Sequence, residues 1–218
     1  PDAYFSATKV ASILDDYPEI RARADAGEAL FGTVDSWLIY RLSRGAAHVT
    51  DVTNASRTML FDIHRLDWSE ELLADLPVPR QMLPRVVDSS GSVCDIGLDR
   101  FEGIAPITGI AGDQHAALFG QLCFEPGDAK HTIGTGSFLL MNTGDHPFVS
   151  DRGLLATVGW KTSARPVYAS EGSVFVSGSA GQWPRGGVGV IETSAGIESL
   201  LGTGTDSGGG GFVPPPGG

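Results

Sequence analysis

The sequence predicts an α/β protein that contains parts of two domains. Helical patterns and short apolar strands alternate up to the loop 123–127, and beyond this loop short strand-like runs are separated by glycine. Such a change of texture is typical of a domain boundary. We therefore expect the C-terminal part of one domain over residues 1–124 and the start of a second domain over residues 125–183.

The first domain is expected to begin with two helices. Ser6 is a favourable N-cap, because its hydroxyl can accept a hydrogen bond from a free backbone N–H group, and the helix that follows should end near Pro18. Residues 30–34 are consistent with a short strand or a turn. They lead into a helix over residues 35–42 that Gly45 should close.

The middle of the chain mixes short extended segments with two further helices. Threonine and asparagine cluster over residues 48–62, which predicts short extended pieces. Ser69 is expected to cap a helix that the prolines after residue 76 stop. Strands are predicted near residues 91–96 and 106–110, and a helix should follow Asp113.

The second domain is predicted to be rich in strands. Its strand-like runs cover residues 129–133, 137–142, 154–160 and 166–171. A helix is expected to begin near Ser173 and to continue through Ala180. Residues 184–218 are dominated by glycine and proline and cannot bury much apolar surface, so we expect a disordered or aberrant tail.

Composition excludes several classes of protein. The 218 residues carry a formal net charge of −11, which argues against a nucleic-acid partner. No apolar run approaches the roughly 20 residues that a membrane helix needs, so stable membrane insertion is not expected. Two cysteines and no signal peptide favour the cytoplasm. The chain opens at Pro1 on sequence that resembles the middle of a domain, and a fragment is therefore expected.

Asp113 is the first candidate for chemistry. It follows a strand and a tight glycine turn and stands at the start of an amphipathic helix. One interpretation is an acidic residue that satisfies free N–H groups and the helix dipole. The other is a general base that accepts the proton of an alcohol as it attacks the γ-phosphorus of ATP. The pattern alone leaves both open.

Two glycine turns are candidates for phosphate or nucleotide contact. The segment Gly134, Thr135 and Gly136 is either a hairpin turn or a loop whose backbone N–H groups surround phosphate oxygens. It is not a Walker loop, since no Gly-Lys-Ser/Thr follows. The turn 172–178 either packs a helix closely on a sheet or approaches a nucleotide, with Gln182 one helical turn beyond Gly178.

A metal site built from side chains is not expected. His115 and His131 stand alone, without the spacing of a ligand set.

Taken together, six segments resemble the FGGY carbohydrate kinases, and within them the members that phosphorylate glycerol. The resemblance covers roughly residues 1–183, and any one segment is weak evidence by itself. In this order and spacing they are specific. The segments are residues 4–9 (Tyr-Phe-Ser-Ala-Thr-Lys), 31–38 (Phe-Gly-Thr-Val-Asp-Ser-Trp-Leu), 50–58, 109–114 (Gly-Ile-Ala-Gly-Asp-Gln), 134–144 and 171–175 (Glu-Gly-Ser-Val-Phe).

The resemblance implies an actin-like, ribonuclease H-like fold in which ATP and substrate meet between two domains. It implies a catalytic base at Asp113 and glycerol contacts from Tyr4, Asp113, Gln114 and Phe138. Nucleotide contacts are implied for Gly134, Thr135, Gly136, Gly178 and Gln182. It further implies ATP and Mg²⁺ as cofactors and a homo-oligomer, a dimer or tetramer, when the protein is complete.

The chain also departs from the family pattern. The N-terminal Asp-Gly-Thr phosphate loop, an Arg-Glu pair that grips glycerol and the C-terminal part of the adenosine pocket are absent, so the 218 residues alone are expected to be inactive. Pro184 stands where the family continues a helix, which puts Gln182 in doubt. A kinase for another polyol or a pentulose, and a truncated form that only binds, remain alternatives.

Overall fold

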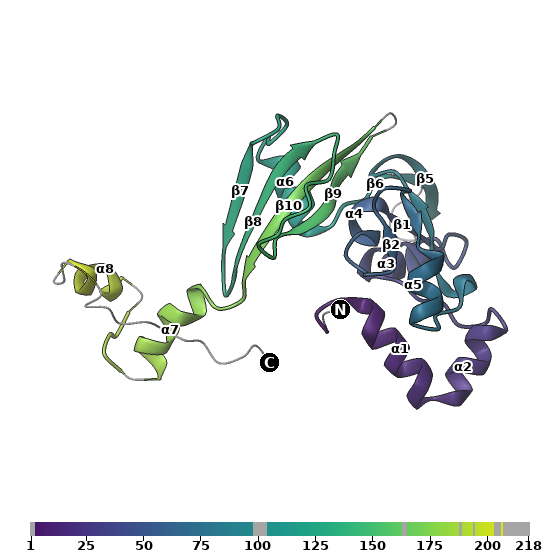
Figure 1. Cartoon of the computed structure of the whole chain (residues 1–218), viewed down its shortest axis with the longest axis horizontal. Coiled ribbons are helices and arrows are strands. Elements are labelled where there is room, and N and C mark those ends of the chain that lie inside the picture. The colour runs from purple at the N-terminus through teal and green to yellow at the C-terminus, as the bar shows by residue number, and fades with distance from the viewer. Residues whose placement is uncertain are drawn as a thin grey trace.

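The computed structural model describes residues 3–97, 104–162, 165–187, 189–193, 195–202 and 206. Two bodies are visible in Figure 1, a mainly helical half at the N-terminus and a four-stranded sheet that follows it. Two helices extend beyond the far end of the sheet. None of the helices in the described part of the chain is both long and apolar enough to span a membrane.

Over the residues that the structure describes, the helical half holds five α-helices, a 3₁₀ helix and three two-stranded pairings. The helices are α1 (Ser6–Asp16), α2 (Pro18–Asp25), α3 (Val34–Leu42), α4 (Val52–Ala55), α5 (Glu70–Asp75) and η1 (Arg80–Met82). The strands are β1 (Val49–Asp51), β2 (Phe61–Asp62), β3 (Asp67–Trp68), β4 (Arg85–Val87), β5 (Ser90–Gly97) and β6 (Ile104–Gly109). β1 pairs with β4 in parallel, while β2–β3 and β5–β6 are antiparallel.

The two N-caps predicted from sequence can be compared with the structure. The Ser69 hydroxyl accepts a hydrogen bond from Leu72 N at 3.3 Å, which confirms the predicted cap of α5. The Ser6 prediction is wrong, because Phe5 occupies the N-cap of α1 and makes no side-chain cap. Residues 30–34 form no strand until α3 begins at Val34, and the Phe31 N–H donates instead to Met82 O.

Most buried apolar residues of the helical half form one core, and Ile39, Val49 and Ile110 form a smaller, separate cluster. α1 contributes Ala7, Val10 and Leu14, whose spacing places them on one face of the helix. Leu60 and Trp68 pack into the same core from the segment after α4. This burial is the main force that holds the short elements together.

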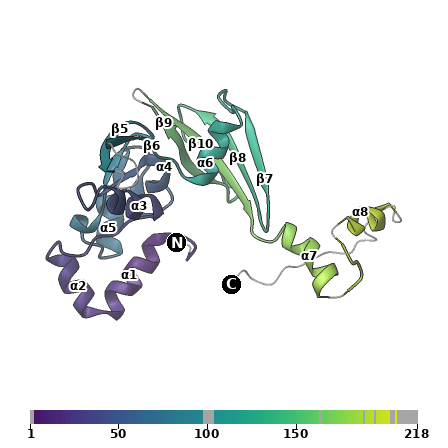
Figure 2. The ribbon, with the colours of Figure 1, turned by 180° about the vertical axis from the view of Figure 1, so that it is seen from behind.

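The second half is a fully antiparallel sheet in the order β7-β8-β10-β9. Its strands are β7 (Ala129–Ile133), β8 (Ser137–Gly144), β9 (Leu155–Lys161) and β10 (Pro166–Val174), which confirms the four predicted runs. Helix α6 (Asp113–Gly120) connects the halves and lies on one face of the sheet (Figure 2). Leu118 of α6 packs there against Leu140 and Trp160.

The halves are joined by packing and by side-chain hydrogen bonds. Val158 and Tyr168 of the sheet belong to the core of the helical half. The hydroxyls of Ser56 and Thr157 lie 2.8 Å apart, and the Tyr168 hydroxyl donates to Ile63 O at 2.9 Å. α4 and strands β9 and β10 therefore form the interface between the two halves.

The region after the sheet differs from expectation. The predicted helix start near Ser173 is wrong, since β10 runs to Val174 and α7 spans Gly178–Gly186. Pro184 lies inside α7 without ending it, and the residue range expected to be a tail begins within this helix. Residues Gly196–Leu201 form helix α8. Residues 188, 194, 203–205 and 207–218 of the expected tail lie outside the described residues.

Candidate active site

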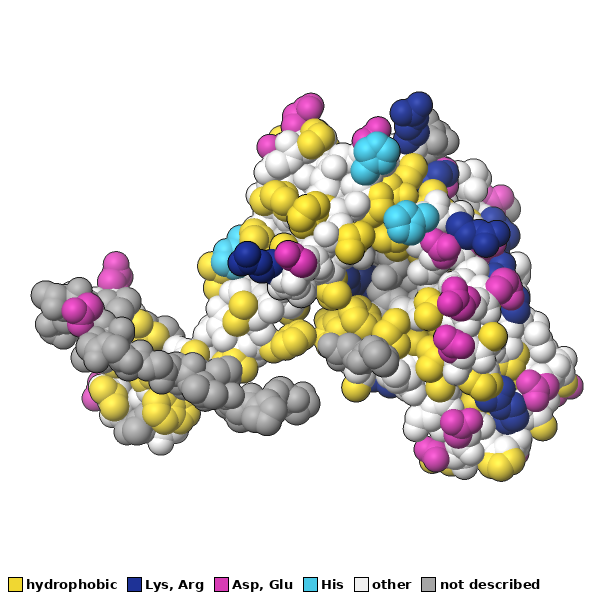
Figure 3. Space-filling model, in the orientation of Figure 1, with side chains coloured by type: hydrophobic (Ala, Val, Ile, Leu, Met, Phe, Trp, Pro, Cys, Tyr) yellow, Lys and Arg dark blue, Asp and Glu magenta, His cyan; other side chains and the backbone are white. Residues whose placement is uncertain are grey.

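A cleft of about 750 Å³ lies between the two halves. Figure 3 shows the surface hollowed where the helical half meets the sheet. The lining side chains come from the segment before α1, the start of α3, α4, the start of α6, and strands β8 and β10. Tyr4, Asp113, Gln114 and Phe138 all line this cleft. The structure thus brings together the four residues expected to hold the acceptor.

Asp113 is the first residue of α6 and is exposed to the cleft. The N-cap position belongs to Gly112, whose extended backbone (φ −61°, ψ 149°) carries no side chain. Asp113 Oδ1 accepts from Gln114 N at 2.8 Å. Its negative charge also lies favourably at the positive end of the helix. Both sequence interpretations fit this geometry, because the remaining acceptor capacity of the carboxylate still faces the cleft.

The turn before Asp113 requires a glycine because of a neighbouring histidine. A Cβ atom at Gly112 would stand 2.9 Å from His115 Nδ1. His115 is buried, and its Nε2 lies 3.2 Å from Thr157 Oγ1. Burial, with a smaller contribution from nearby Arg57, lowers the pKa of His115 to about 3. His115 is therefore a neutral support beneath the cleft rather than a proton carrier.

Gln114 is oriented by a buried lysine. Lys130 of β7 donates to Gln114 Oε1, to Thr132 Oγ1 at 3.0 Å and to Phe138 O at 3.4 Å. With its oxygen occupied, Gln114 directs its amide Nε2 toward Asp113 Oδ2 at 3.4 Å. Burial lowers the pKa of Lys130, while Glu171 and Asp113 oppose that shift. The lysine thus fixes which end of Gln114 acts as donor at the cleft.

An ion pair that the sequence analysis missed crosses the cleft wall. Arg57 Nη2 donates to Glu171 Oε1 at 3.0 Å, and both residues line the cleft. Ser173 Oγ donates to the same carboxylate oxygen at 2.8 Å. The two partners are 114 positions apart in sequence, so no local pattern could pair them. Both residues do stand in segments that carry the family resemblance, and this was the only signal available.

The aromatic rings of Tyr4 and Phe138 line the cleft, and those of Phe5 and Phe175 lie beside Tyr4. The Tyr4 ring lies 5.5 Å from that of Phe175, which follows β10. Tyr4 also contacts Phe5 edge to face at 5.4 Å. Phe138 of β8 is half-buried and adds an apolar surface. The cleft therefore offers polar groups at Asp113 and Gln114 beside apolar ring faces, which suits a small polyol with a carbon skeleton.

The loop Gly134–Gly136 connects β7 to β8 and lies against the start of α7. The Gly178 N–H donates to Gly134 O at 2.9 Å, and the Ser177 N–H donates to Thr135 O at 2.9 Å. A Cβ at Gly178 would stand 2.3 Å from Gly134 O, so only glycine fits. The hairpin interpretation is confirmed as geometry. It is compatible with a phosphate loop.

Gln182 follows Gly178 by four residues, so the two lie on the same face of α7. The Gln182 side chain is exposed. The five residues expected to contact the nucleotide therefore come from one loop and the helix that packs against it.

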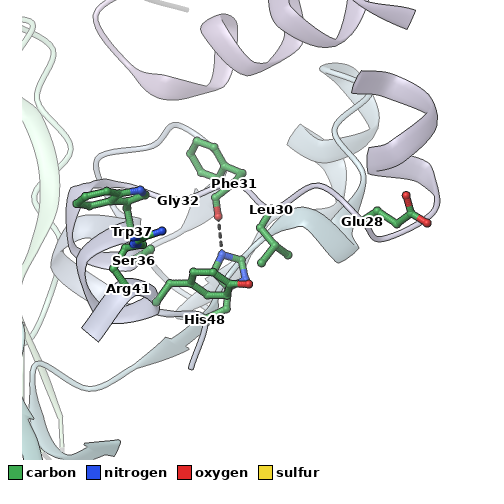
Figure 4. Close-up of a pocket in the computed structure, with 9 residues that line it drawn as sticks. Glu28, Leu30, Phe31, Gly32, Ser36, Trp37, Arg41 and His48 are labelled. Carbon is green, nitrogen blue, oxygen red and sulfur yellow. Dashed lines mark hydrogen bonds between the residues drawn. The ribbon is translucent and has the colours of Figure 1, made fainter. Parts of the chain in front are cut away.

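A second cavity, of about 420 Å³, lies beside α3 and has different chemistry. In Figure 4, His48 points toward Phe31 and bonds to its carbonyl oxygen, at 2.7 Å, while Glu28 lies apart from the other side chains. Trp37 and Tyr40 supply apolar surface. No carboxylate is directed at a polar cluster in this cavity among the residues that the structure describes, so it does not fit phosphoryl transfer.

Comparison with known proteins decides the family. The N-terminal domain of the FGGY family of carbohydrate kinases matches residues 2–120, more than half of the chain. The chain belongs to this family. Its fold is the actin-like ATPase fold of the FGGY sugar kinases.

Individual relatives are similar over most of this chain. A glycerol kinase of Aromatoleum aromaticum is 57% identical over 214 residues, which are 98% of this chain and 43% of that protein. The crystal structure of Plasmodium falciparum glycerol kinase with ADP aligns with a TM-score of 0.86 at 35% identity, over 93% of this chain and 40% of that one.

A ligand-bound xylulose kinase from Lactobacillus acidophilus aligns with a TM-score of 0.77 at 18% identity, over 91% of this chain and 40% of that one, and shows the shared fold. The chain spans about two fifths of the length of the curated relatives it matches.

Proposed function

We propose that the complete protein transfers the γ-phosphoryl group of ATP to glycerol and forms sn-glycerol 3-phosphate. The observation that carries this proposal is the convergence of Tyr4, Asp113, Gln114 and Phe138 on one cleft. The glycerol kinases at 51–57% identity support glycerol as the acceptor.

Asp113 is the proposed general base. Its carboxylate accepts the proton of the attacking hydroxyl, whose oxygen forms the new bond to phosphorus while the bond to the bridging oxygen of ADP breaks. Gln114 donates to a glycerol hydroxyl, because Lys130 occupies its oxygen. Tyr4 adds a hydroxyl, and Phe138 packs on the carbon side of the substrate.

The glycine loop and α7 are the proposed nucleotide side. Gly134, Thr135 and Gly136 present small groups that phosphate oxygens can approach, with the Thr135 hydroxyl as a further donor. Gly178 and Gln182 would contact the rest of the nucleotide. ADP in the similar Plasmodium falciparum structure supports ATP as the donor.

Mg²⁺ would be held mainly by the nucleotide. Within the described residues no group of three or more His, Cys, Asp or Glu side chains could form a metal cage. Glu171 is occupied by Arg57 and Ser173, whereas Asp113 remains accessible. This donor set fits a cation that keeps its waters and arrives on phosphate oxygens, where it would neutralise developing charge.

Organisation, location and assembly complete the proposal. We place residues 1–124 in the N-terminal domain and residues 125–183 at the start of the C-terminal domain, and the family match over residues 2–120 supports this division. Both cysteines, Cys94 and Cys123, are free thiols, which supports the cytoplasm. A homo-oligomer, dimer or tetramer, belongs to the proposal as a property of the complete protein.

The acceptor is tested by steady-state kinetics of the full-length protein with ATP and glycerol, erythritol or xylulose. We expect glycerol to have the highest kcat/KM. A higher kcat/KM for xylulose would replace glycerol with a pentulose as the substrate. The 218-residue chain alone is expected to show no turnover with radiolabelled ATP, because it spans about two fifths of its relatives.

A further inference from the structure

A fully buried carboxylate lies behind the cleft, and the proposed reaction does not use it. Asp51 ends β1, and its exposed fraction is 0%. Its Oδ1 accepts from Thr53 Oγ1 at 2.8 Å, from Asn54 N at 3.0 Å and from Asn54 Nδ2 at 2.9 Å. Its Oδ2 accepts from Ser89 Oγ at 2.8 Å. Burial raises the pKa of the Asp51 carboxyl, and these four hydrogen bonds oppose that shift because they favour the charged form.

Thr53 connects this carboxylate to the turn that precedes Asp113. The Gly112 N–H donates to Thr53 Oγ1 at 2.9 Å. A hydroxyl has one hydrogen to donate, and an ionised carboxylate can only accept. The hydrogen bonds therefore run in one direction: the Gly112 N–H donates to the Thr53 hydroxyl, and that hydroxyl donates to Asp51. Thr53 is itself fully buried, so water does not compete for these bonds.

Ser89 connects the same carboxylate to the other end of the turn. The Ser89 hydroxyl donates to Asp51 Oδ2, and the Ser89 carbonyl accepts from Ile110 N at 2.9 Å. Asp51 is thus linked to residue 110 through Ser89 and to residue 112 through Thr53. Asp113 is the next residue along the chain, so its backbone direction depends on this turn.

We propose that Asp51 and Thr53 are positioning residues of the phosphoryl-transfer site: they hold the turn from Ile110 to Gly112 and thereby aim the Asp113 carboxylate into the cleft. This inference rests on the proposed role of Asp113. Neither residue touches the reacting atoms. Their effect acts through geometry, because a misplacement of about 1 Å can lower a rate by about 100-fold.

The decisive variant is Thr53→Val in the full-length protein, which keeps the shape of the side chain and removes the hydroxyl. We expect kcat to fall by about 10- to 100-fold while the KM for ATP stays within twofold. Thr53→Ser restores the hydroxyl and should recover most of the parent kcat. Asp51→Asn should lower kcat at least tenfold, because either orientation of the amide replaces one acceptor oxygen with a donor.

Thr58→Val is the matched control. Thr58 is also a buried threonine, and its hydroxyl accepts from Leu60 N at 3.1 Å and donates to Ala55 O at 2.7 Å. Its loss should lower stability by a similar amount without affecting Gly112. We expect kcat of Thr58→Val within twofold of the parent.

Hydrogen exchange measured on peptides that contain Gly112 tests the geometry without any substrate. Thr53→Val should accelerate exchange of the Gly112 amide at least tenfold, and Thr58→Val should not. Unchanged exchange, or a kcat for Thr53→Val equal to that of Thr58→Val, would overturn the inference. Equal losses in Thr53→Ser and Thr53→Val would also overturn it.

These outcomes are distinct from failure of the proposed function. If another acceptor proves to be the substrate, the same kcat ratios are measured with that acceptor. If Asp113→Asn keeps parent activity, the base assignment fails, and with it the catalytic part of this inference. The exchange result would still decide whether Thr53 holds Gly112.

Discussion

The acceptor side and the nucleotide side of the candidate site are held together in different ways. On the acceptor side, buried side chains connect elements that are distant in sequence, such as Thr53 with Gly112, 59 positions later, and Arg57 with Glu171. On the nucleotide side, the loop Gly134–Gly136 and α7 meet mainly through backbone atoms. No side chain of α7 is buried.

This difference teaches which kind of substitution each side tolerates. A network of hydroxyls, amides and charges is sensitive to loss of a polar atom, because its buried partner is then unsatisfied. A close backbone approach between glycines is sensitive to added volume. Substitutions that remove a polar group should therefore impair the acceptor side, and substitutions that add volume should impair the nucleotide side.

The largest effect is expected at the acceptor side, for Asp113→Asn in the full-length protein. Removing a general base lowers kcat by about 100- to 10,000-fold. The amide keeps the size of the side chain, so the KM for glycerol should change little. Steady-state kinetics check this, and parent-like kcat would show that Asp113 only supports the helix start.

The next largest effect is expected on the nucleotide side, for a substitution that adds side-chain volume. Gly178→Ala places a Cβ against Gly134 O, so the loop must shift. Overpacking of this kind costs about 2 kcal/mol, which is roughly 30-fold in ADP affinity. Calorimetry with ADP measures the change. Gly186→Ala on the same helix is the control, since nothing lies within 4 Å of its Cβ position, and equal losses in both variants would contradict the loop contact.

A smaller effect is expected on the acceptor side, for a substitution that removes a hydrogen-bond donor. Lys130→Met removes the donor to Gln114 Oε1, so Gln114 is free to turn. We expect the KM for glycerol to rise about tenfold, in the range of a hydrogen bond to a charged group. Lys161→Met is the control, because Lys161 pairs with Asp88. An unchanged KM in Lys130→Met would show that Gln114 needs no orientation.

The smallest effect concerns stability at acid pH. His115 stays neutral in the folded protein because burial lowers its pKa to about 3, while the unfolded chain binds a proton near pH 6.5. Stability is therefore highest above pH 6.5 and falls as the pH decreases from 6.5 toward 3. Arg57 and Lys130 also disfavour its protonation, whereas Asp113 favours it.

His115→Gln removes this titration. Relative to the parent, the variant should retain about 1 kcal/mol more stability between pH 7 and pH 5.5. Denaturant unfolding at both pH values measures this difference. The same loss of stability in both proteins would show that His115 is protonated in the fold.

Local chemistry predicted much of the fold. The Ser69 cap, the four strands of the sheet and the helix at Asp113 follow from short-range patterns and are found in the structure. The helix start near Ser173 was wrong because Val174 fits a strand as well as a helix, and pairing with Ser137 of β8 extends the strand. Tertiary partners decide such cases.

The candidate site could be located in sequence only through the family resemblance. The pattern around Asp113 by itself favours a helix-start residue over a general base. No local pattern pairs the supporting residues, Lys130 with Gln114 and Arg57 with Glu171, because the partners are distant in sequence. Their contribution depends on three-dimensional contact, which spacing and composition do not contain.

The interface between the halves determines which residues move most when one half rotates against the other. The Arg57–Glu171 ion pair and the hydrogen bond between Ser56 and Thr157 link the helical half to the sheet. Because these contacts hold the halves together, a rotation of one half against the other displaces the linked residues least and more distant residues most. The ring of Tyr4, which lines the cleft, lies 5.5 Å from the ring of Phe175, which follows β10 of the sheet. Rotation of the helical half against the sheet would therefore separate these two rings more than it separates the bonded pairs.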